Sequence, residues 1–198
     1  MPERPEKVRV SERSLRQTVT AVFEKMGESP EGAAEAADVM VSTDLRGVTI
    51  QGVTNLLRSY VKAYNEGHLN PRPNWRVIRE TPATAVVDAD RGLVPVFGCE
   101  IMKLAMEKAA KMGMGIVTMY NCGDSGAIGH HAMLAARQNM IGMCATASGP
   151  MVLPTNGAEP RFGTNPIAVA APARNQPPVL FDIATSAIAG GTPGLALR

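Results

Sequence analysis

The order of the expected elements constrains the fold of this chain more than any other feature of the sequence. Helical patterns fill the first third, and Pro71-Arg72-Pro73 separates them from a longer part with both strands and helices. That part is expected to run strand, strand, helix, strand, helix and three further strands. This order favours an α+β fold with a mixed, largely antiparallel sheet over a doubly wound parallel one. We expect a helical subdomain over residues 1–72 and a mixed domain over 73–198.

Three helices are predicted in the first part from their ends and their apolar spacing. The first would begin after Ser11, a good N-cap residue, and end at Gly27. The second would begin at Ser29-Pro30, because proline suits the first helical position, and would end near Gly47. The third is expected over residues 53–65.

The second part is divided by turn residues and by changes in apolar spacing. Two helices are expected there, over residues 96–112 and 127–138. The expected strands cover residues 75–79, 84–87, 115–120, 140–147, 166–171 and 178–182.

Composition excludes several classes of protein. The net charge is +2 with both signs mixed, and 4% of the residues are aromatic, so no basic surface for nucleic acid is expected. No apolar run reaches the roughly 18 residues that span a bilayer, and the polar start predicts no signal peptide. Cys99, Cys122 and Cys144 match no metal or disulfide pattern, which favours a reduced, cytoplasmic setting without a metal.

Generic catalytic motifs are missing, but four segments together resemble one family. The sequence has no GxGxxG after a strand, no GxxxxGK[ST], no HExxH and no GxSxG. The four segments are DLRGVTIQGV (44–53), NCGDSGAIGHH (121–131), FGTNPIAVAAP (162–172) and LFDIATS (180–186). Their order and spacing resemble the malate/L-lactate dehydrogenase-like family of NAD(P)-dependent oxidoreductases, over about residues 10–190.

The resemblance implies a reaction, a cofactor and partners. The expected reaction is hydride transfer between NAD or NADP and a small 2-hydroxy or 2-oxo acid, or a related imine. The implied cofactor domain is not a Rossmann fold, in agreement with the missing GxGxxG. The implied partners are a small carboxylate substrate and a second subunit, in a homodimer or in association with a full-length relative.

Gln51 and Asp124 occupy the positions of the family's two acid–base histidines. Gln51 can donate a hydrogen bond to a carbonyl oxygen, but it cannot take a proton near neutral pH. Asp124 could act as a base if burial raised its pKa. Alternatively, Gln51 is an ordinary residue at a helix start, and Asp124 is a loop residue that caps the next helix.

Arg46 is retained from the family pattern and is the candidate for binding the substrate carboxylate. Its planar guanidinium can form two parallel hydrogen bonds with such a group. The alternative is an arginine that interacts with the negative end of its helix. His130 and His131 could lie near the pocket, but we expect a surface or core pair.

The candidate cofactor residues fall in three places along the chain. Ser148 follows an expected strand and matches a family serine that touches the dinucleotide. Gly163 and Asn165 belong to a tight loop whose backbone N–H groups could approach phosphate. Asp182, Ile183 and Ala184 match a family segment that lies along the cofactor. Alternatively, these residues only shape the turns between strands.

The end of the sequence departs from the family pattern. After Ser186 we expect a V-A-x-G-K segment and a long C-terminal portion, whereas the chain continues AIAGGTPGLALR. We therefore expect a C-terminally truncated member with an incomplete cofactor domain and exposed apolar surface. This leaves an alternative function, a catalytically silent family member or a binding subunit that depends on a partner.

Overall fold

The first part of the chain is helical in the computed structural model, which describes residues 9–187. The Ser11 hydroxyl accepts a hydrogen bond from the Ser14 backbone N–H, and the Ser29 hydroxyl accepts one from the Gly32 backbone N–H. Both predicted caps are confirmed, because each satisfies an N–H that the first helical turn leaves free. The elements are α1 (Glu12–Lys25), α2 (Pro30–Leu45), the 3-10 helix η1 (Thr49–Gln51) and α3 (Val53–Asn65).

A three-stranded sheet, called sheet A, follows the Pro71–Pro73 stretch. Its central strand β2 (Thr84–Asp88) pairs antiparallel with β1 (Arg76–Glu80) and parallel with β3 (Ile116–Tyr120). The helix α4 (Val94–Met112) connects β2 to β3, as a parallel pair requires. It ends at Gly113, whose φ of +83° is the left-handed conformation common after helices.

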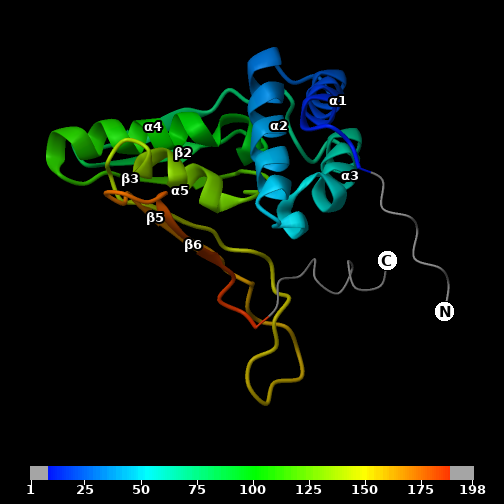
Figure 1. The fold of residues 1–198 in the computed structure, drawn as a ribbon. Coiled ribbons are helices and arrows are strands. Elements are labelled where there is room, and N and C mark those ends of the chain that lie inside the picture. The colour runs from blue at the N-terminus through cyan, green and yellow to red at the C-terminus, as the bar shows by residue number, and fades with distance from the viewer. Residues whose placement is uncertain (1–8, 188–198) are drawn as a thin grey trace.

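A second three-stranded sheet, called sheet B, is antiparallel. Its order is β4 (Gly142–Ala145), β5 (Ile167–Ala171), β6 (Val179–Ile183). The helix α5 (Ile128–Ala136) covers one face so closely that a Cβ on Gly142 would lie 2.2 Å from the Ala132 carbonyl oxygen. Figure 1 shows β5 and β6 below α4 and α5. The predicted α+β class with largely antiparallel pairing is confirmed.

Two apolar clusters hold these elements together. The larger contains Phe23, Met40, Tyr64, Val87 and Phe97, from α1, α2, α3, β2 and α4. It therefore extends across residue 72, where the sequence predicts a boundary. The smaller cluster lies between α5 and sheet B.

The differences from the sequence predictions concern element ends and the grouping of strands. The helix expected to reach residue 138 stops at Ala136, because the Gln138 and Met140 N–H groups turn back to Ala135 and Asn139 has φ +58°. The strands form two sheets in place of one. Expectations for residues 1–8 and for the tail after Ala187 lie outside the described residues.

Candidate cofactor and substrate site

The three segments with candidate cofactor residues meet at one end of sheet B. In antiparallel strands the end of one lies beside the start of the next. The register pairs Ala145 with Ile167, and Ile167 with Ile183. The structure therefore brings to this end the residues Ser148, Gly163, Asn165, Asp182, Ile183 and Ala184.

Ser148 and the loop before β5 are joined by hydrogen bonds. The Ser148 hydroxyl accepts one of 2.9 Å from the Thr164 backbone N–H, and the Asn165 side-chain oxygen accepts one of 3.3 Å from the Ser148 backbone N–H. A Cβ on Gly163 would lie 2.4 Å from the Ser148 carbonyl oxygen, so only glycine fits there. Asn165 has φ +39°, which asparagine tolerates better than most residues. The loop therefore has one defined shape.

The chemistry of this end fits the polar groups of a dinucleotide. Ser148 is exposed and can offer its hydroxyl to a ligand, whereas the space beside Gly163 is filled by Ser148 and Asn165. The Thr185 backbone N–H and hydroxyl both donate to the Thr164 carbonyl oxygen, at 2.9 and 3.0 Å. This pair of bonds holds the segment after β6 against the loop, so the candidate residues on both segments keep fixed positions.

Asp182 and Ile183 lie on opposite faces of β6. Asp182 faces α5, and its Oδ2 accepts a hydrogen bond of 3.0 Å from the Gly129 backbone N–H in the first turn of that helix. The N-cap residue Ala127 offers no side-chain bond, so Asp182 supplies the negative charge that a helix N-terminus favours. Burial raises the pKa of Asp182, whereas Gly129 and the Arg46 guanidinium lower it.

Arg46 lies close to this group of residues. It is the C-cap residue of α2 and is exposed. Its guanidinium partly opposes the burial that raises the pKa of Asp182, and it adds to the burial that lowers the pKa of His130. Its side chain has no hydrogen bond or ion pair with another residue of the 9–187 range. The guanidinium can therefore bind a carboxylate. The position of Arg46 at the C-terminal end of α2 also suits the alternative, in which its charge interacts with the negative end of the helix dipole.

Asp124 lies in the loop between β3 and α5. Its Oδ1 accepts hydrogen bonds of 2.7 Å from the Tyr60 hydroxyl and 2.7 Å from the Gly126 backbone N–H. The interpretation of Asp124 as a helix cap is wrong, because Gly126 precedes α5 and the N-cap residue is Ala127. Burial, together with the Asp124 carboxylate, raises the pKa of Tyr60 well above its usual value, so the phenol remains a donor.

A contact ties the Asp124 loop to sheet B. The Ser125 and Thr146 hydroxyl oxygens lie 3.0 Å apart, and the Thr146 backbone N–H donates to the Pro166 carbonyl oxygen. Asp124 therefore lies beside the same end of sheet B as Ser148. Sequence patterns did not reveal Tyr60 as its partner, because the two residues are 64 positions apart.

Gln51 is half-buried at the end of η1, and its side chain hydrogen-bonds to none of residues 9–187. The start of α3 is instead held by Asp44, whose Oδ2 accepts a hydrogen bond of 2.9 Å from the Val53 backbone N–H. Asp44 Oδ1 is buried without a partner, and burial raises the pKa of this carboxyl. Gln51 and Asp124 thus border the same helix, since Tyr60 also belongs to α3.

The two histidines form a core pair, in agreement with the sequence expectation. His130 Nδ1 lies 3.2 Å from the Ser42 hydroxyl oxygen, and its Nε2 lies 3.6 Å from Asp38 Oδ2. Asp38, Ser42 and Arg46 recur every four residues along α2, a spacing that places them on one face and could have indicated this group.

His131 has a more apolar environment than His130. Its Nδ1 lies 3.8 Å from Cys99 Sγ, and its Nε2 is buried without a hydrogen-bond partner. Burial, with a smaller effect from His130, lowers the pKa of His131 to about 4. The ring is therefore neutral at physiological pH.

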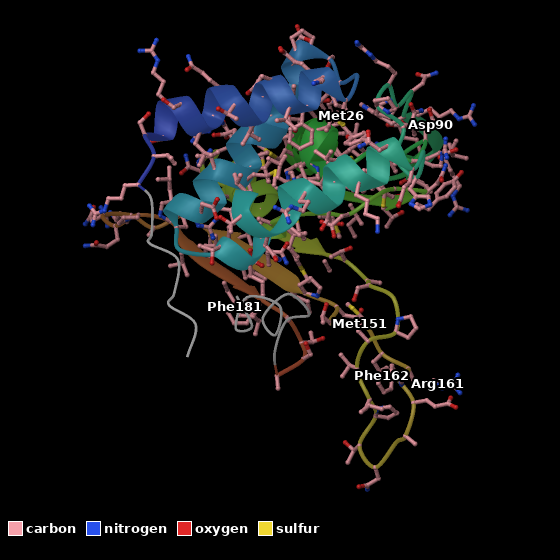
Figure 2. The ribbon with its side chains drawn as sticks, turned by 90° about the vertical axis from the view of Figure 1, so that its right-hand side faces the viewer. Met26, Asp90, Met151, Arg161, Phe162 and Phe181 are labelled. Carbon is pink, nitrogen blue, oxygen red and sulfur yellow. The ribbon has the colours of Figure 1, made fainter. Side chains whose placement is uncertain are left out.

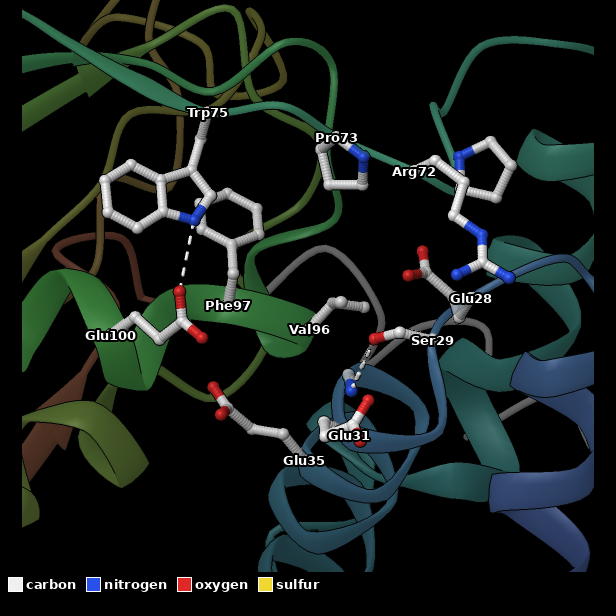
Figure 3. A pocket seen from close by; sticks show the side chains of 12 residues that line it. Glu28, Ser29, Glu31, Glu35, Arg72, Pro73, Trp75, Val96, Phe97 and Glu100 are labelled. Atoms are coloured by element: carbon white, nitrogen blue, oxygen red, sulfur yellow. Dashed lines mark hydrogen bonds between the residues drawn. The ribbon is translucent and has the colours of Figure 1, made fainter.

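A cleft of about 350 Å³ lies elsewhere, between the starts of α2 and α4 and the Pro71–Trp75 segment. Figure 3 shows its acidic lining, in which the Trp75 indole N–H donates to Glu100 at 3.2 Å. Burial raises the pKa of Glu28 and Glu35 there. None of the candidate residues lines this cleft, so it is separate from the candidate site.

Residues 9–187 contain neither a candidate metal centre nor a candidate membrane span. No group of three or more His, Cys, Asp or Glu side chains in this range is placed to hold a metal ion. No helix in it has the length and apolar character needed to cross a membrane.

Comparison with known proteins gives one consistent result. The family model described as malate/L-lactate dehydrogenase matches residues 10–198. Malate dehydrogenase of Pyrococcus abyssi is 43% identical over 181 residues, which cover 91% of this chain and 49% of that protein. L-sulfolactate dehydrogenase of Methanocaldococcus jannaschii is 40% identical over 89% of this chain and 51% of its own length. The chain thus spans about half the length of these relatives.

The fold matches solved structures of the same group. Malate dehydrogenase from Pyrococcus horikoshii OT3 superposes with a TM-score of 0.89 at 43% identity. The match covers 93% of this chain and 52% of that chain. The elements described above are therefore arranged as in one half of that structure.

Proposed function

Because the chain belongs to the malate/L-lactate dehydrogenase family, we propose that it forms the cofactor and substrate site of an NAD(P)-dependent oxidoreductase. The proposed reaction is hydride transfer between the nicotinamide and a small 2-hydroxy or 2-oxo acid, or a related imine. Membership of an oxidoreductase family rests on the matches. The cofactor, substrate and catalytic competence belong to the proposal.

One observation carries the proposal most strongly. Ser148, the Gly163–Asn165 loop and the end of β6 are held together at one end of sheet B, with Arg46 acting on Asp182 beside them. Segments far apart in the chain thus bring an exposed hydroxyl, a backbone loop of defined shape and a free guanidinium into one region. These are the groups that a dinucleotide and a carboxylate substrate need.

Each candidate residue has a defined task in this proposal. Ser148, Gly163, Asn165 and the Asp182–Ala184 segment would hold the dinucleotide, whose nicotinamide carries the hydride when bound. Arg46 binds and orients the substrate carboxylate through two hydrogen bonds.

The hydroxyl proton of the substrate must leave as the hydride does, and we assign its uptake to Asp124. Tyr60 fixes the position of the Asp124 carboxylate through its 2.7 Å hydrogen bond. Gln51 can donate a hydrogen bond to the carbonyl oxygen of the oxidised substrate.

A second candidate function is a silent family member or a binding subunit that depends on a partner. The observation that favours it is the state of the acid–base positions. Gln51 cannot take a proton near neutral pH, and Asp124 Oδ1 already accepts hydrogen bonds from the Tyr60 hydroxyl and the Gly126 backbone N–H. In this case the chain binds the dinucleotide without turnover.

The setting and assembly are also proposals. Cys99, Cys122 and Cys144 are free thiols, which suits a reducing, cytoplasmic environment. We place the protein there, as a homodimer or in association with a full-length relative.

A steady-state screen tests the proposed reaction. NADH and NADPH are each offered with pyruvate, oxaloacetate and a cyclic ketimine, and oxidation of the cofactor is followed by its absorbance. Turnover that is lost in Arg46→Ala supports the oxidoreductase. Cofactor binding without turnover supports the silent subunit, and absence of both contradicts the proposed site.

A further inference from the structure

We propose that one face of sheet B is a docking surface for the half of the family fold that this chain does not match. Successive strand residues point to opposite faces, so each sheet has an inner and an outer side. We call the outer side of sheet B the open face. The register assigns to it Met143, Ala145, Ile167, Val169, Ala171, Val179, Phe181 and Ile183.

The inner side of sheet B is already covered. Ala168 and Ala170 are fully buried against α5, and Leu180 packs on the same cluster. No helix of residues 9–187 covers the open face: Met143 is 62% exposed, Val179 63% and Phe181 51%, and Ile167, Val169 and Ala171 are half-buried. Every side chain on it is apolar, which is unusual for a sheet surface that remains in water.

Sheet A provides an internal comparison. Its inner side is buried, with Ala85 and Val87 in the core. Its outer side mixes Thr84, Asp88 and Thr118 with the apolar Val86, Ile116 and Tyr120, and Arg76 pairs with Asp88 at its edge. This mixture is typical of a solvated sheet face. The chain thus gives polar residues to the exposed face of one sheet and none to that of the other.

A second apolar feature lies on the same side of the molecule. Residues 149–162, which we call the arm, project from the end of β4 and are held by a bridge between Val152 and Phe162. Met151, Leu153 and Phe162 on the arm are each more than half exposed. Figure 2 shows the arm and Phe181 in the lower part of the molecule, away from α1–α3.

The occupant follows from the comparison of lengths. The P. horikoshii structure contains almost all of this fold, and 48% of that chain lies outside the match (100 − 52). That half must pack against the matched half through some surface. Apolar side chains are also exposed elsewhere in residues 9–187, such as Ile116 and Tyr120 on sheet A, but there they share the face with polar ones. We therefore assign the all-apolar open face, together with the arm, to a polypeptide with the sequence of that half.

The test uses the unmatched half of P. abyssi malate dehydrogenase as the probe, co-expressed with this chain under separate tags. We expect a 1:1 complex, in which amide hydrogen exchange slows in β4–β6 and in the arm. The variants Met143→Glu and Phe181→Glu should each weaken the complex at least tenfold. Met114→Glu is the matched control, because Met114 is 56% exposed outside the open face.

Circular dichroism of the three variants alone checks that their folds are intact, since none of these side chains is buried. The matched half of the P. abyssi protein, run alongside, provides the positive control for the probe. The proposal is overturned if no complex forms, if the complex tolerates both glutamates, or if protection appears elsewhere. A dimer of this chain alone that Phe181→Glu abolishes would also overturn it, because a second copy would then occupy the face.

Discussion

Asp182 on β6 accepts a hydrogen bond of 3.0 Å from the Gly129 backbone N–H at the start of α5, 53 residues earlier in the chain. A Cβ on Gly129 would lie 2.3 Å from the Asp182 carboxylate oxygen, so the contact requires glycine. It binds the helix that covers sheet B to the strand that ends at the candidate site. Asp182 therefore has a structural task whatever else it binds.

The Asp182–Gly129 contact predicts a coupling between two substitutions. Asp182→Ala should lower the free energy of unfolding by about 1 kcal/mol, as loss of an N-terminal cap does. In a Gly129→Ala background the same change should cost much less, because the carboxylate has already been displaced. Urea unfolding of the four proteins measures this. Equal costs in both backgrounds would show that the contact contributes nothing.

Asp124→Asn should lower kcat by at least about 100-fold, the usual effect of losing a general base. The dissociation constant of the cofactor should stay within about twofold, since Asp124 is assigned no cofactor contact. Stopped-flow turnover and a binding titration separate the two effects. Glu159→Gln, an exposed change on the arm, is the control. If kcat is unchanged, the proton goes to another group.

Gln51→His should add a titratable group where this chain has none. We expect kcat to rise, with a pH profile that gains an apparent pKa near about 6.5, the ordinary histidine value. Gln51→Asn tests whether a change of side-chain size alone alters kcat, and it should add no new apparent pKa to the pH profile. A variant with the pH profile of the natural chain would place Gln51 outside the reaction.

His131 predicts a loss of stability in acid. Its pKa is about 4 in the folded chain, against about 6.5 in an unfolded one. Between these two pH values the histidine is protonated in the unfolded state but neutral in the folded state. The free energy of unfolding therefore falls as the pH falls from about 6.5 to about 4. His131→Phe removes this effect. Relative to the variant, the natural chain should lose up to about 3 kcal/mol across that window.

Unfolding free energies of both proteins from pH 4 to 7 give the comparison, and the difference cancels the carboxyl groups that titrate in the same range. His68→Phe, at an exposed position, should follow the natural chain. Parallel curves for His131→Phe and the natural chain would mean that burial of His131 does not shift its pKa.

The features that the sequence predicted well depend on neighbouring residues. The caps at Ser11 and Ser29, and the end of α4 at Gly113, follow from side chains and backbone preferences within a few positions. The contacts of the site could not be predicted in this way. Tyr60 and Asp124 are 64 positions apart and leave no periodic signal, so their hydrogen bond depends on packing of the whole chain.

The strands of the site likewise show that local features could be predicted from the sequence, whereas contacts between distant segments could not. The three segments at the end of sheet B could be located by resemblance, and each strand was predicted within a few residues. That these three strands form a separate sheet could be seen only from the strand pairing in the structure. The alternation of side chains within a strand does not reveal which strand it pairs with. The opposite orientations of Asp182 and Ile183 follow directly once β6 is placed.

The most direct test of the central claim is the protection of this chain from thermal unfolding by NADH and by NADPH. A ligand that binds only the folded state at 100 times its Kd adds about 2.7 kcal/mol of stability. We predict a clear rise in Tm with one of them, lost in Ser148→Glu and kept in Ser59→Glu, an exposed change in α3. No rise with either cofactor, or a rise that Ser148→Glu leaves intact, would contradict a dinucleotide site at the end of sheet B.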